Sequence, residues 1–120
     1  MVNVYDKAYE LARALKASPE FLSYTKIKEK LEKDKETWQR IVDFRQKQLE
    51  IQARQLQGQK IEEELSQLQN LFNLLAANRD IAEFFQAEYA FSRLMFDIQK
   101  IIGEAVGLDM DWEKQMKTGS

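Results

Sequence analysis

Residues 79–106 read RDIAEFFQAEYAFSRLMFDIQKIIGEAV, and this stretch decides the fold. Its large apolar side chains recur at alternating intervals of four and three residues, which is the spacing of one face of an α-helix. Asn78 stands directly before the stretch and suits a helix N-cap, while the chain turns polar after Gly107. We therefore expect one long helix of about 28 residues, which spans roughly 42 Å at 1.5 Å per residue.

The apolar seam of this helix is longer than a compact chain of this size. It consists of Phe84, Glu88, Phe91, Met95, Ile98, Ile102 and Ala105, widened by Ile81, Phe85, Leu94 and Ile101. A compact globule of this length is only about 35 Å across, so the helix should overhang a monomer. We predict a homodimer through the last two helices, with self-association carried by Phe84, Phe85, Phe91, Leu94, Met95 and Ile98.

Two further amphipathic stretches flank Gly58, a glycine suited to the left-handed end of a helix. Apolar positions before it are Ile41, Val42, Leu49, Ala53 and Leu56, with Phe44 and Ile51 on a neighbouring face. Those after it are Ile61, Leu65, Leu68, Phe72 and Leu75. The pattern predicts an antiparallel helical hairpin whose first arm is in contact on more than one side.

Nearer the N-terminus, Asn3 can cap a helix that continues to about Ala17, and Ser18 starts a second one. Residues 33–35 fit either a break, with Asp34 as the next cap, or a continuous bent helix. The expected fold is an all-α, elongated antiparallel bundle of about five helices with a long helical hairpin. We expect residues 1–107 to form one domain and 108–120 a polar, flexible tail.

The absence of cysteine and histidine closes most routes to catalysis. No thiolate nucleophile, disulfide frame, Cys/His zinc site, Ser-His-Asp triad or imidazole proton shuttle can be built, so neither a cofactor nor an enzyme is expected. Carboxylates alone remain for metal binding, and Glu62, Glu63 and Glu64 spread around a helix instead of converging. No membrane span or secretory signal is recognisable, which favours a cytoplasmic protein.

The net charge of −2 conceals an uneven distribution. Residues 1–60 carry 13 basic and 9 acidic side chains, whereas residues 61–120 carry 5 and 11. Either these are solvated helix faces, or the two halves, or two copies, attract each other. Nucleic-acid binding is disfavoured because acidic residues interrupt the basic segment. Eight of the 12 glutamines fall within residues 46–69, where they mark either a solvated hairpin or a contact surface that stays soluble before assembly.

Glu88 interrupts the apolar seam of the long helix, where an unpaired carboxylate is costly. It can lie at the edge of the seam and reach water, pair with an arginine, or act as a catalytic carboxylate. Candidate arginines are Arg45, Arg54 and Arg93. Arg45 is the natural partner because it interrupts the preceding helix in the same way, and the pair would set helix register or dimer specificity.

The order of these signatures resembles the YlbF/YmcA family of small helical proteins from Gram-positive bacteria, in particular its YheA-like branch. The likeness runs to about Gly107 and starts with VYDKAYEL at residues 4–11. It continues through Ala14-Leu15, Ser18-Pro19-Glu20, Phe44-Arg45, Leu49, Gly58, Ala87-Glu88, Phe91, Leu94, Ile98, Ile101 and Ile102.

This resemblance implies a homo-oligomeric cytoplasmic protein without enzymatic activity. Relatives act as adaptors in a regulatory complex that affects competence, sporulation, biofilm formation and messenger RNA processing by ribonuclease Y. Some relatives carry an iron-sulfur cluster held by cysteines, which this chain lacks. The expected function is therefore that of a non-catalytic interaction or adaptor protein. A carboxylate-based metal-binding protein or small enzyme, and a weak RNA-binding protein using residues 26–35, remain the alternatives.

Overall fold

The computed structural model describes residues 3–108, which form five α-helices. These are α1 (Val4–Lys16), α2 (Pro19–Glu32), α3 (Lys35–Leu56), α4 (Glu62–Ala76) and α5 (Arg79–Val106). No strand occurs in this part of the chain, so the predicted all-α class is confirmed. From residue 109 onward, the expected flexible tail lies outside the described residues.

Four of the helices begin at the side-chain caps that the sequence indicates. Asn3, Ser18, Asp34 and Asn78 each accept a hydrogen bond from a backbone N–H in the first turn of the helix that follows. Such a bond satisfies a donor that has no partner within the helix. Since Asp34 caps α3, the chain breaks at residues 33–35 and is not a single bent helix.

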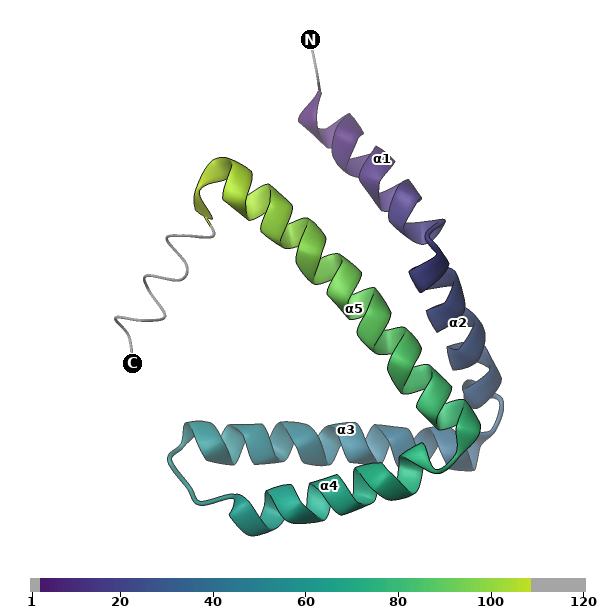
Figure 1. Ribbon diagram of the computed structural model, residues 1–120, viewed down its shortest axis with the longest axis vertical. Helices are drawn as coiled ribbons and strands as arrows, with labels where there is room; N and C mark the ends of the chain where they lie inside the picture. Colours follow the sequence, from purple (N-terminus) through teal and green to yellow (C-terminus); the bar gives the residue numbers. More distant parts are fainter. Residues whose placement is uncertain (1–2, 109–120) are drawn as a thin grey trace.

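The five helices make an open V (Figure 1). One arm is the antiparallel hairpin of α3 and α4, joined at Gly58, whose φ of +81° is left-handed as predicted. The other arm is α5 packed antiparallel against α2, with α1 continuing beyond the start of α2. The molecule measures 53 × 40 × 17 Å and has a radius of gyration of 18.3 Å. A compact chain of this length would have about 14 Å, so the V is open.

The hydrophobic core lies where the two arms meet, which we call the closed end. Phe84 of α5 is its centre, 2% exposed, with its ring 5.6 Å from that of Trp38 and 5.8 Å from that of Tyr24. Side chains from α2, α3, α4 and α5 complete the core, namely Ile27, Leu31, Ile41, Phe44, Leu75 and Ile81. The closed end therefore holds the four longer helices together, and α1 contributes nothing to it.

Helix α3 buries a different face from the main stripe that its sequence suggests. Ile41 is buried as expected, but Leu49 is exposed. Phe44 and Ile51, from the neighbouring face, are buried in its place. The reason is that α3 packs against α2 and α4, and its aromatic side chains meet those of α5, so the buried face follows those neighbours.

Candidate interaction surface

Arg45 of α3 and Glu88 of α5 form an ion pair across the inner corner of the V. Both side chains are about one-third exposed. The guanidinium of Arg45 also lies over the ring of Phe85, 5.3 Å from its centroid. Glu88 therefore pairs with Arg45, as the sequence suggested. The pair links the hairpin arm to the α5 arm.

Burial governs the electrostatics of this pair. Loss of water lowers the pKa of Arg45 below its ordinary value, and the nearby Tyr24 opposes this effect. An arginine remains charged at any pH in the physiological range. Arg45 is therefore a fixed positive charge in the link between the two arms.

A hollow of about 500 Å³ opens beside the ion pair, between α3, α4 and α5. Aromatic rings dominate its apolar part, and its polar members are mostly uncharged. The lining residues are Phe44, Arg45, Gln48, Phe72, Phe85, Gln86, Glu88, Tyr89 and Ser92. Of these, Tyr89 is 69% exposed, so one wall of the hollow is an aromatic ring that its own chain leaves uncovered.

A second hollow of about 220 Å³ adjoins the first along the hairpin. The two share Phe44, Gln48 and Phe72, and the second adds Leu65 and Leu68. We call the continuous depression the hairpin groove. Its floor is aromatic and aliphatic, while glutamine side chains line its polar part.

The structure divides the predicted self-association residues into two groups. Phe84 belongs to the core of the single chain and is not available to a partner, which corrects its assignment to a dimer contact. Phe85 packs between Phe44 and Phe72, with ring centroids 6.0 and 5.3 Å away. Phe91 packs on α2, 5.4 Å from Phe21. The observed contacts of these aromatic residues are therefore within one chain, where they stabilise the fold.

The remaining three residues, Leu94, Met95 and Ile98, are half-buried. They begin the outer half of α5, residues 94–106, which extends beyond the closed end. Four apolar side chains there are at least half exposed, namely Phe96, Ile101, Ile102 and Val106. The outer half of α5 is therefore an apolar helix without sufficient cover from its own chain.

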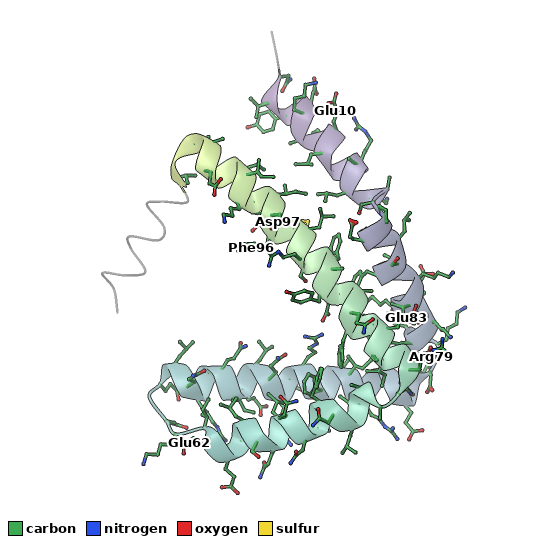
Figure 2. All side chains as sticks on the ribbon, viewed as in Figure 1. Glu10, Glu62, Arg79, Glu83, Phe96 and Asp97 are labelled. Atoms are coloured by element: carbon green, nitrogen blue, oxygen red, sulfur yellow. The ribbon has the colours of Figure 1, made fainter. Side chains whose placement is uncertain are left out.

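The sequence reasoning missed Tyr89 and Phe96. Figure 2 shows Phe96 on the side of α5 that looks toward the α3–α4 hairpin, the side from which Tyr89 lines the groove. Phe85, Tyr89, Ser92 and Phe96 follow the same four-three-four spacing as the seam. This second register was the available signal, and it predicts that α5 has two contact faces.

Helix α1 has no buried residue. Its stripe of Val4, Ala8, Leu11 and Leu15 gives one apolar face, yet Val4 is 77% exposed. Of the other helices that the structure describes, it packs only against α2, to which it is joined end to end. It is the least supported element of the structure.

No three acidic side chains among residues 3–108 converge at metal-binding distance. The lysines of α2 are also partly engaged, since Lys30 pairs with Asp80 at 3.2 Å and Lys28 lies over the ring of Tyr24. None of the helices described is both apolar enough and long enough to cross a membrane.

A family model described as "Control of competence regulator ComK, YlbF/YmcA" matches residues 4–107. The chain belongs to the YlbF/YmcA family. The matched residues run from the first residue of α1 to the glycine that ends α5. The exposed helices are therefore as much part of the family pattern as the closed end is.

Individual relatives match almost end to end. A UPF0342 protein from Caldicellulosiruptor saccharolyticus is 46% identical over 90% of this chain and 91% of its own length. UPF0342 protein STH1710 from Symbiobacterium thermophilum is 40% identical over 92% of this chain and its own full length. One from Clostridium tetani is 36% identical over 95% and 99%. No solved structure matches the chain.

Proposed function

We propose that this protein is a non-catalytic regulatory adaptor that associates with itself, as a homodimer, and presents apolar helical surfaces to other proteins of a regulatory complex. The family description links its members to control of a competence regulator, which supports a regulatory role. Sporulation, biofilm formation and messenger RNA processing are further roles proposed from the resemblance, as is a cytoplasmic location.

The observation that carries this proposal is the amount of surface left uncovered. Large apolar side chains on the described helices remain exposed, among them Val4 at 77%, Phe96 at 59% and Ile101 at 67%. A standard protein interface buries about 800 Å² on each partner and can cover such side chains. Because much of the exposed surface is apolar and helical, a protein partner is the natural cover.

We place the self-association contact on the outer half of α5. Leu94, Met95 and Ile98 are half-buried there, and Ile101 and Ile102 are more than half exposed. Phe85, Arg45 and Glu88 lie further toward the closed end, where the ion pair can set the register of a partner helix. Contact between two such surfaces, related by a twofold axis, removes the same apolar face from water on both copies.

Light scattering of wild type and two single variants tests the contact. Ile102→Asp puts a charge on the exposed apolar face and should convert the dimer to a monomer. Glu104→Lys makes a larger change of charge two residues later, at an exposed position between the two apolar faces of α5, and should leave the dimer intact. A wild-type chain that is monomeric at every concentration would exclude self-association, and circular dichroism shows whether each variant still folds.

The adaptor role has a separate test in cells. In a strain lacking this protein, complementation with Ile102→Asp should fail to restore the regulated phenotype, whereas Glu104→Lys should restore it. Variants of exposed carboxylates outside the proposed contacts, such as Glu29→Gln and Glu83→Gln, should also restore it, because an adaptor needs no acid or base. Failure of a carboxylate variant that still folds and dimerises would favour the enzymatic or metal-binding alternative.

A further inference from the structure

Helix α1 needs cover that its own chain does not provide. It is a 13-residue amphipathic helix with no buried residue, and among the five helices described it packs only against α2. Isolated helices shorter than about 12–15 residues are marginal in water, because nucleation costs more than so few hydrogen bonds return. Its apolar stripe, from Val4 to Leu15, must therefore be covered by another surface if α1 is to persist.

The hairpin groove is a surface of matching kind. Its floor includes Phe72, Phe85 and Leu65, and its walls are helices whose backbone groups are already bonded within each helix. Such a groove accepts the apolar face of a helix and offers no edge to a strand. The stripe of α1, from Val4 to Leu15, covers about 17 Å at 1.5 Å per residue, and the two adjoining hollows share Phe44, Gln48 and Phe72.

The groove of the same chain is out of reach of α1. The connection to α2 consists of Ala17 and Ser18, and the Ser18 cap fixes the start of α2. Figure 1 shows α5 between α1 and the hairpin, so α1 would have to cross α5 to enter its own groove. A second copy of the chain can supply the helix without any such crossing.

We infer that, in the dimer, α1 of each copy occupies the hairpin groove of the other copy, an inference that rests on the self-association proposed above. With the two V-shaped copies interlocked, the two α5 helices lie side by side and α1 is on the outer side of each. Each hairpin then meets the partner's α1. A twofold axis makes the exchange reciprocal, so the apolar faces of both α1 helices and of both grooves are buried in the same dimer.

Charge at the rim of the groove supports this choice of occupant. Lys7 and Lys16 lie on the two flanks of the apolar stripe of α1. Helix α4, which forms one wall of the groove, carries Glu62, Glu63 and Glu64 in its first turn, next to the end of the groove that Leu65 lines, and no basic residue. The charged side chains in the lining itself, Arg45 and Glu88, pair with each other, so the attraction acts between the lysines of α1 and the carboxylates at the rim.

Cross-linking tests the exchange directly, because the chain contains no cysteine of its own. Ala8→Cys labels the apolar stripe of α1, and Gln48→Cys labels the groove. After the two single variants are mixed and oxidised, a disulfide-linked dimer should form, and neither variant alone should give it. Gln46→Cys is the matched control, since a position two residues away points to the opposite side of α3 and should not link.

An independent measurement uses affinity. Leu11→Gln removes an apolar side chain from the α1 stripe and should weaken dimerisation at least tenfold in Kd. Arg13→Gln, on the opposite side of the same helix, should change it less than twofold. Both variants keep a helix-forming residue, so their folding can be verified by circular dichroism.

The possible outcomes distinguish the exchange of α1 from the proposed self-association on which it rests. A monomeric wild type overturns both. A dimeric wild type overturns the exchange, and leaves self-association intact, if the mixed Ala8→Cys and Gln48→Cys variants form no disulfide and Leu11→Gln keeps its affinity. A link formed within a single chain of the doubly substituted protein, but not between mixed single variants, shows that α1 enters its own groove and also overturns the exchange.

Discussion

The closed end of the V contrasts with its open end, which α1 and the outer half of α5 form. Both ends consist of amphipathic helices, but the apolar side chains are buried at the closed end and exposed at the open end. Phe84 at the closed end is 2% exposed, whereas Phe96, twelve residues later on the same helix, is 59% exposed. Both belong to apolar stripes with helical spacing, and both ends have capped helices. The comparison shows that local sequence signals determine where helices form. Burial of their apolar faces by other helices of the same chain determines which of them are stable in the monomer.

Truncation of one phenylalanine at each end is expected to give the largest contrast. Phe84→Ala leaves a cavity in the core and should lower the free energy of unfolding by about 3–5 kcal/mol. Phe96→Ala removes an exposed ring and should change it by less than about 0.5 kcal/mol when the protein is dilute enough to be monomeric. Urea unfolding followed by circular dichroism measures both, and similar losses would mean that the two ends are equally packed.

Removal of one N-cap at each end should sharpen the same contrast. Asn78 caps α5 beside the core, so Asn78→Ala should lower the free energy of global unfolding by about 1 kcal/mol. Asn3 caps α1, and in the dilute monomer Asn3→Ala should increase fraying of α1 without altering global unfolding. Hydrogen exchange resolves the two effects, because only α1 amides should exchange faster in the Asn3 variant.

A smaller effect is expected for the ion pairs. A double-mutant cycle on Arg45 and Glu88 should give a coupling of about 1 kcal/mol, the upper part of the range for partly exposed pairs. Arg93 and Asp97, which pair at 3.4 Å on exposed α5 surface, should couple by no more than about 0.5 kcal/mol. If the exposed pair couples more strongly, the inner corner owes its geometry to packing and not to this link.

The sequence was sufficient to predict the helices because four of the five begin at a side-chain cap that the sequence shows. Ser18 and Asp34 accept hydrogen bonds from the turns that follow them, and Gly58 adopts the left-handed conformation expected at a helix end. These contacts join residues at most three positions apart. No knowledge of the tertiary fold is needed to anticipate them.

The covered faces were harder to predict because they depend on which helix lies opposite. An amphipathic stripe shows that a face should be buried, but Leu49 and Phe44 on α3 satisfy that condition equally in the sequence. Only the positions of α2, α4 and α5 decide that Phe44 is buried. The Arg45–Glu88 pair could be predicted because two charges in two apolar stripes leave few ways to avoid an unpaired charge.

The junctions at the two ends should also differ in their response to acid, which is the smallest of the predicted effects. At the α2–α3 junction, the Thr37 hydroxyl donates to Asp34 Oδ2 at 2.7 Å, and this bond, followed by the Thr37 backbone N–H, lowers the pKa of Asp34 below its ordinary 3.8. At the α1–α2 junction the cap is Ser18, which has no charge to lose.

Because the pKa of Asp34 is lower in the folded chain, its contribution to stability is present above pH 3.8 and is lost as the pH falls through the native value. The Tm of wild type should therefore fall slightly more on acidification than that of Asp34→Asn, which keeps a cap but cannot titrate. Thr37→Val removes the hydroxyl donor and should return the carboxyl pKa toward its ordinary value. A carboxyl that titrates at or above 3.8 by NMR in the wild type would show that the α2–α3 junction is no more sensitive to acid than the junction at Ser18.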